Sequence, residues 1–282
     1  MNRIPQLILL ALLAAGCSCA VAQQPGAAPP AKPAQTGRHI PEAKTHEEFN
    51  DYNTAYALSG GPDVERAAEA FERKYPSSEL KGFLYAKALH EYQNEQNTGK
   101  MLSVGRKIIE IDPDNTIALV LTATVLADAL RTEDSDRQKK VDEIKKDAEH
   151  ALDTVDSAFT PPANATPEQI TAYKKTLQSM AHSALGITAL KTDDNLVAER
   201  ELKLAAELNV TQPDPYIWYH LALAQDHQKK YSEALDSVNH ALQVMGANAD
   251  LGNLAKGEQG RLLTLTGGAA SSPEKVPAQS PK

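Results

Sequence analysis

Residues 218–235 read WYHLALAQDHQKKYSEAL, two apolar-periodic segments separated by a short polar stretch. Trp218, Leu221 and Ala222 lie at helical spacing before the polar stretch, and a second periodic segment follows it with Ala234. A large side chain and a leucine at this spacing fill the space between two antiparallel helices, and a small residue lets their backbones approach. The stretch therefore predicts a helix-turn-helix unit with Trp218 and Leu221 packed between its helices.

The same arrangement recurs upstream, with a period of 34 residues in the first three units and 36 in the last two. The position of the large first residue is held by Asp51, Tyr85 and Leu119, which are 34 residues apart, and by His182 and Trp218, which are 36 apart. A period of this size is typical of stacked helical repeats, each of which buries its apolar face against its neighbours. We therefore expect five such units.

These units resemble the tetratricopeptide repeat family, whose pattern is W-x2-L-G-x2-Y, then A-x3-F, then P. Leu221 and Ala222 match the Leu-Gly pair in the last unit, although Gln225 replaces the Tyr; Leu185 and Gly186 match the pair in the unit before it. The third unit is degenerate, with about nine extra residues between its helices. The resemblance implies an all-α, helix-turn-helix repeat solenoid of about five units, followed by a C-terminal capping helix.

Composition divides the chain into four segments. Residues 1–22 have the layout of a signal peptide, and residues 23–44 are rich in Pro, Ala and Gln without apolar periodicity, which predicts an extended linker. Residues 45–266 show helical periodicity throughout and form the predicted solenoid. Residues 267–282 resemble the linker in composition, so we expect a disordered tail.

The first residues predict export to the periplasm, the cell envelope or the medium. Arg3 precedes an apolar run over 7–15, which is too short to span a bilayer. Two kinds of processing remain open. Residues 20–22 read AVA, an A-x-A cleavage site, whereas AAGC ending at Cys17 resembles the lipobox of bacterial lipoproteins and predicts lipidation there.

Charge argues against a nucleic-acid partner. The chain carries 29 basic and 37 acidic residues, a net charge of −8, and removal of residues 1–22 takes away only Arg3 and leaves 28 − 37 = −9. A polyanion binder normally shows a basic stripe, but the basic residues here alternate with acidic ones. The densest run, residues 131–150, therefore predicts a solvated helix face.

The sequence offers few candidates for catalysis or metal binding. His220 and His227 are seven residues apart on one predicted helix, without a second pair of ligands at zinc-site spacing. HEEF at 46–49 lacks the second His of H-E-x-x-H, and the sequence contains no G-x-S-x-G, P-loop or G-x-G-x-x-G motif. We expect no enzyme activity, no cofactor and no metal.

The family resemblance implies that the first helix of each pair lines a concave groove for an extended peptide or a helix. One turn apart on those helices lie apolar and aromatic side chains, which predict a protein partner or self-association. Membrane association is expected only through a lipid anchor. The predicted groove residues are Phe49, Tyr52, Tyr56, Phe83, Lys87, His90, Val120, Leu121, Thr124, Met180, Ile187, Tyr216, Tyr219, His220 and Leu223.

Tetratricopeptide domains that capture acidic chaperone tails use several Lys, Arg and Asn side chains converging on a carboxylate. Lys87 is the one fixed cation on the corresponding faces of the first three units here. The groove is therefore expected to favour apolar or aromatic peptides. Two functions remain open: an interaction scaffold of the envelope, or a lipid-anchored accessory factor in envelope assembly or transport.

Overall fold

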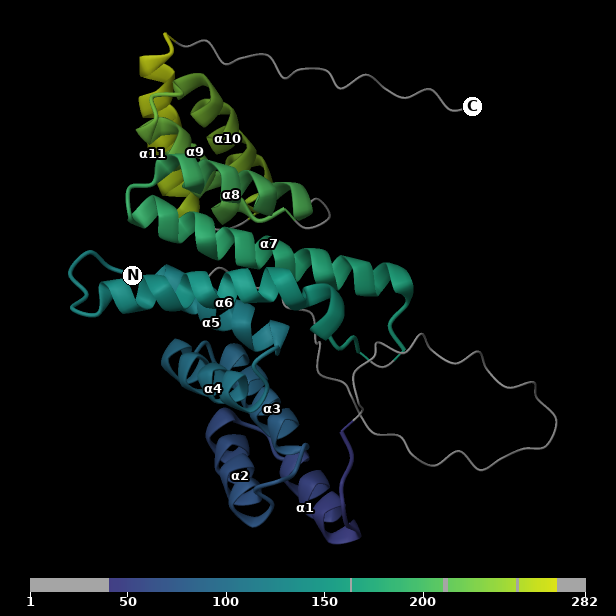
Figure 1. Cartoon of the computed structure of the whole chain (residues 1–282). Helices are drawn as coiled ribbons and strands as arrows, with labels where there is room; N and C mark the ends of the chain where they lie inside the picture. Colours follow the sequence, from purple (N-terminus) through teal and green to yellow (C-terminus); the bar gives the residue numbers. More distant parts are fainter. Residues whose placement is uncertain (1–40, 163, 210–212, 247–248, 268–282) are drawn as a thin grey trace, which may run out of the picture. The chain divides into compact units, whose positions relative to one another are not determined.

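The structure is a computed structural model that describes residues 41–162, 164–209, 213–246 and 249–267; in these ranges all regular structure is helical (Figure 1). The predicted all-α class is confirmed. The predicted signal peptide, Cys17, the linker up to residue 40 and the tail from residue 268 lie outside the described residues. The helices are α1 (His46–Tyr56), α2 (Gly61–Lys74), α3 (Lys81–Asn94), α4 (Thr98–Ile111), α5 (Thr116–Ala129), α6 (Arg137–Ala158), α7 (Pro167–Lys191), α8 (Asn195–Leu208), α9 (Pro215–His227), α10 (Tyr231–Val244) and α11 (Ala249–Leu265).

The described residues form two compact units that divide between residues 184 and 185, within α7. The first unit contains α1 to α6 and most of α7, and the second contains the end of α7 and α8 to α11. The sequence predicts one continuous helical body over 45–266, so the division inside a single helix is not visible in the repeat pattern.

Successive helices pack as pairs, and these pairs correspond to the five predicted units. Contacts join α1 to α2, α3 to α4, α5 to α6, and α9 to α10. In the remaining pair, a Cβ added at Gly186 of α7 would lie 2.6 Å from Cγ of Leu202 in α8, so the two helices approach closely at this glycine. α11 packs against α10 as the predicted final helix. The fold is a tetratricopeptide-like helical repeat.

The turn inside a pair has the same geometry in three of the five units. Gln96, Asp193 and Lys229 each occupy the second position of a three-residue turn and have φ of 55°, 63° and 62°. In each turn the next residue donates its backbone N–H to a carbonyl five residues back, at 2.9 to 3.0 Å. This left-handed C-terminal motif satisfies helix-end carbonyls and reverses the chain. The repeat is therefore a repeat of backbone geometry as well as of side chains.

The third pair departs from the others in a way the sequence analysis did not predict. The connection between α5 and α6, residues 130–136, has seven residues instead of three. That connection accounts for only part of the extra length, because α6 has 22 residues whereas α4, α5, α8 and α10 have 14 each. Most of the insertion therefore lengthens the second helix of the unit.

The mixed-charge run at 131–150 leads into α6 and covers its first half, where most charged side chains are exposed, as predicted. Asp147 is the exception. Only 4% of its surface is exposed, and it lies between the buried residues Ile144 and Ala148. Burial, reinforced by the negative charge of Glu143, raises the pKa of Asp147 to about 6.

A regular polar ladder joins α2, α3 and α4. Tyr85 of α3 donates to Glu72 of α2 at 2.7 Å, and Lys107 of α4 lies 3.1 Å from the same carboxylate. Seven residues away on each helix, a second set repeats this arrangement with Tyr92, Glu65 and Lys100. Burial and the neighbouring carboxylates hold the pKa of both tyrosine hydroxyls well above the ordinary value, so both remain protonated donors.

Candidate protein-binding surface

In the first unit, the partly exposed members of the predicted groove lie on α1 and α3, which contact each other. Phe49 and Tyr56 on α1, and Phe83, Lys87 and His90 on α3, are all half-buried. Nζ of Lys87 lies 5.2 Å from the centre of the Tyr56 ring, so the lysine side chain bridges the two helices. These five residues define the α1/α3 surface.

The positive charge of Lys87 is already engaged within the protein. Its ammonium lies 3.3 Å from Oε1 of Glu91, one turn along α3, as well as over the ring of Tyr56. Its side chain is only 17% exposed. A lysine held in this way offers little attraction to an acidic ligand, because a new carboxylate would compete with Glu91.

Six of the predicted groove residues lie in the interior instead. Tyr52 is 6% exposed and packs edge-on against Phe71 of α2, with ring centres 6.3 Å apart. α5 is buried on every side, because eleven of its fourteen residues are buried and its sequence offers no charged side chain before Asp128. The third unit therefore contributes core packing at these positions. The other five buried residues are Val120, Leu121, Thr124, Met180 and Ile187.

In the second unit, the predicted groove residues of α9 are half-buried: Tyr216, Tyr219, His220 and Leu223. Tyr219 packs against the buried cluster that α9, α10 and α11 share. The imidazole of His220 donates from Nδ1 to the carbonyl of Tyr216 at 2.8 Å, and burial lowers its pKa to about 4. His220 is therefore neutral at pH 7, and its one ring N–H is used inside its own helix.

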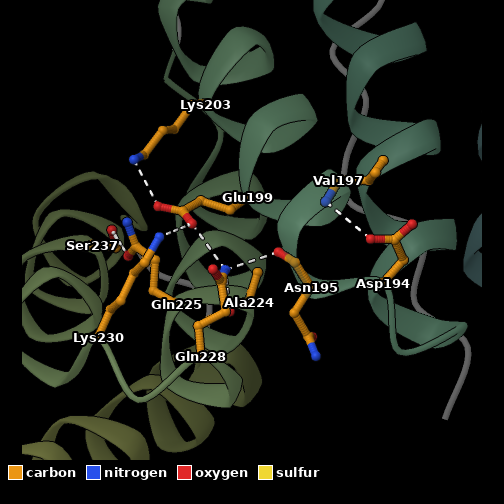
Figure 2. Close-up of polar contacts among 10 residues, drawn as sticks. All are labelled: Asp194, Asn195, Val197, Glu199, Lys203, Ala224, Gln225, Gln228, Lys230 and Ser237. Carbon is orange, nitrogen blue, oxygen red and sulfur yellow. Dashed lines mark hydrogen bonds and ion pairs between the residues drawn. The ribbon is translucent and has the colours of Figure 1, made fainter.

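A polar cluster that the sequence analysis did not predict joins α8 to the turn between α9 and α10 (Figure 2). Glu199, buried on α8, accepts hydrogen bonds from Lys203 at 2.7 Å, Lys230 at 2.6 Å and Gln228 at 2.9 Å. Burial alone would raise the pKa of Glu199, but these three donors outweigh it and lower the pKa to about 2. Gln228 also donates to the carbonyl of Asn195, at the start of α8.

The departure from the family pattern at Gln225 has a structural reason. Gln225 is 3% exposed, and its side-chain oxygen accepts a hydrogen bond from the buried hydroxyl of Ser237 on α10 at 2.7 Å. The bond adds specific pairing between α9 and α10, and the three-residue turn places Gln228 and Lys230 against Glu199 in the same region (Figure 2).

In the described residues, no three His, Cys, Asp or Glu side chains gather as a possible metal site. His227 and His220 have different partners. Nδ1 of His227 lies 3.0 Å from Oδ1 of Asn195, whereas Nδ1 of His220 donates to the carbonyl of Tyr216. No described helix has the length and apolar character needed to cross a membrane.

No protein-family model matches the chain, and no curated protein matches it. Among solved structures, the chain is similar to TTC0263, a thermophilic TPR protein of Thermus thermophilus, with 16% identity, 75% of this chain and 98% of that chain covered, and a TM-score of 0.46. A similarity at this level assigns no residue and no activity. The helix pairs and their repeated turns themselves define the fold.

Proposed function

We propose that this protein is a non-catalytic protein-protein interaction scaffold of the bacterial cell envelope, which binds an apolar or aromatic peptide or helix. One observation carries the proposal: the α1/α3 surface presents three partly exposed aromatic rings, Phe49, Tyr56 and Phe83, on two adjacent helices. Aromatic side chains on a rigid surface are the usual anchors of protein recognition. Helices hold these rings at fixed spacing, so a ligand does not have to order them.

The ligand type follows from the charge of the surface. Lys87 is paired with Glu91, and the chain without residues 1–22 carries a net charge of −9, so an acidic peptide is repelled rather than attracted. An apolar peptide gains affinity from buried area, which depends little on salt. We therefore expect weak salt dependence of binding.

The binding assay is a titration of the whole chain with aromatic-rich and acidic C-terminal peptides at low and high salt. Phe49→Ala and Phe83→Ala are expected to weaken aromatic peptide binding about tenfold or more, in line with about 1.4 kcal/mol or more per lost anchor. Leu196→Ala, at an exposed leucine on α8, is the matched control and is expected to leave affinity unchanged. Tight, salt-sensitive binding of the acidic peptide that Lys87→Ala abolishes would contradict the ligand assignment.

The envelope location is proposed from the N-terminal sequence. A mature N-terminus at Gln23 supports release after cleavage, whereas a lipid on Cys17 supports the alternative function, a lipid-anchored accessory factor in envelope assembly or transport. Mass spectrometry of the protein recovered from cells distinguishes the two forms. Recovery of the chain with intact Met1 would contradict both.

A further inference from the structure

α11 has one buried and one exposed face. Leu251, Ala255 and Leu262 are at most 1% exposed and pack into the second unit. Beside that buried stripe, Leu254 is 58% exposed and Leu265 is 48% exposed. A Cβ added at Gly257, between them in the sequence, would meet nothing within 4 Å, so α11 is open to approach at this position.

The exposed leucines belong to a symmetric row. Leu254, Glu258, Arg261 and Leu265 are spaced by four, three and four residues, which places them along one stripe of the helix. Spacing of this kind forms the contact seam between two helices. The row reads leucine, acid, base, leucine, so each end carries an apolar residue and the centre carries opposite charges.

We infer that this row is a self-association surface, on which α11 of a second copy of the chain packs in antiparallel orientation. In that orientation Leu254 lies opposite Leu265 of the second copy, and Glu258 lies opposite Arg261 of the second copy. Twofold symmetry repeats both contacts, so all four layers are complementary. A parallel arrangement would instead place Glu258 beside Glu258 and Arg261 beside Arg261.

Ion pairs within one chain already hold Glu258 and Arg261, the two charged residues of the row, in place. Arg261 lies 2.7 Å from Glu258 and 2.5 Å from Asp226 of α9, so two carboxylates share one guanidinium. Oδ1 of Asp226 is buried without a hydrogen-bond partner. The side chain of Arg261 is 46% exposed, whereas that of Glu258 is 11% exposed. The guanidinium of a second copy would therefore approach Glu258 only at the edge of its carboxylate that still reaches solvent.

The contact is small. One pair of 17-residue helices buries less than the roughly 1,200–2,000 Å² typical of stable complexes, so the dimer dissociates on dilution. The proposal concerns α11 alone and is independent of the peptide-binding function proposed for the α1/α3 surface.

The test is the mass of the full chain in reducing buffer, measured by analytical ultracentrifugation over a range of concentrations. The wild-type mass is expected to rise from one copy toward two copies as concentration increases. Leu254→Glu and Leu265→Lys are each expected to remain monomeric, whereas Leu196→Glu, an exposed leucine on α8, is expected to dimerise as the wild type does. Circular dichroism checks that every variant retains its helices.

Mixing the variants tests the orientation. A mixture of Leu254→Glu with Leu265→Lys is expected to form a heterodimer, because the new charges face each other across an antiparallel contact. A mixture of Leu254→Glu with Leu254→Lys is expected to remain monomeric, because those positions are about 16 Å apart along the helix axis. A wild-type chain that is monomeric at every concentration, a dimer unaffected by the leucine substitutions, or rescue by the second mixture instead of the first would overturn the proposal.

Discussion

Trp218 has a larger side chain than Leu221 but is less buried. The indole of Trp218 is half-buried and rests on the imidazole of His240 in α10, with ring centres 4.1 Å apart, whereas Leu221 is 2% exposed. The sequence predicts that both side chains are enclosed between α9 and α10, with a cost of roughly 3 to 5 kcal/mol for Trp218→Ala. Leu221 is enclosed as predicted, but Trp218 covers the edge of the pair.

We therefore expect the leucine to matter more than the tryptophan. Leu221→Ala leaves a cavity and lowers the free energy of unfolding by about 2 to 5 kcal/mol, and Trp218→Ala lowers it by only about 2 kcal/mol. Chemical denaturation followed by circular dichroism measures both. A larger loss for Trp218→Ala than for Leu221→Ala would place the indole in the core.

The turn between α9 and α10 places Lys229, which is not a glycine, in a left-handed backbone conformation. Its φ of 62° is a conformation that side chains other than glycine adopt with strain. Lys229→Gly relieves this strain but gives the unfolded chain more freedom. We expect a net gain of about 0.5 kcal/mol in unfolding free energy, while Ser232→Gly, in the first turn of α10, is expected to destabilise. Thermal denaturation of the two variants distinguishes a relieved turn from a general glycine effect.

At the scale of helices, the close approach of α7 and α8 depends on one missing side chain. A methyl group at Gly186 would lie 2.6 Å from Cγ of Leu202, which is fully buried. Gly186→Ala is expected to lower the free energy of unfolding by about 1 to 3 kcal/mol, despite the higher helix propensity of alanine.

Gly260 provides the matched control for this prediction, because a methyl group there meets nothing within 4 Å. Gly260→Ala is expected to stabilise α11 by roughly 0.5 to 1 kcal/mol. Hydrogen exchange of peptides from α7, α8 and α11 measures both effects locally. Equal effects of the two substitutions would show that α7 and α8 do not meet at Gly186.

The sequence predicts helices well where the helix-breaking residues and the apolar periodicity indicate the same helix boundaries. The five pairs follow from the recurring spacing, and Gly186 is at the close contact that the family pattern implies. The length of α6 was not predictable from the pattern, since the extra residues continue a helical period instead of interrupting it. Glu199 is also invisible in the pattern, because its donors Gln228 and Lys230 lie about 30 residues away and meet it only after α8 and α9 have packed.

The predicted groove shows the same limit. Periodicity places a residue on a helix face but does not say what covers that face. Val120 and Leu121 are at positions where the repeat pattern predicts groove residues. Both are at most 3% exposed, because α5 is packed on every side. Phe83 and Lys87, on the equivalent face of α3, remain partly exposed.

At the scale of the whole molecule, one buried carboxyl of the first unit and two groups of the second unit respond to acid in opposite ways. In the first unit, the pKa of Asp147 is raised from 3.8 to about 6, so its burial costs stability increasingly as pH rises through this interval. In the second unit, the pKa of His220 is lowered from 6.5 to about 4, and that of Glu199 from 4.5 to about 2. Both of these shifts contribute stability that is lost as pH falls, first for His220 and then for Glu199.

Asp147→Asn tests this difference. The variant carries no buried charge, so we expect the first unit to gain about 2 kcal/mol at pH 7 and less than half of that at pH 4.5. Hydrogen exchange of peptides from α6 measures the effect, and Glu149→Gln, at an exposed neighbouring position, is the control. An equal gain at both pH values would mean that the carboxyl of Asp147 is not protonated on folding.

The identical turns after α7 and α9 have a consequence for how such a chain changes length during evolution. Asp193 and Lys229 occupy equivalent positions 36 residues apart, and the backbone enters and leaves both turns in the same way. Recombination between the gene segments that encode these two turns adds or removes 36 codons, equal to one second helix and one first helix. The new junction is a turn the protein already uses, so the reading frame and the backbone geometry of the turn are both preserved.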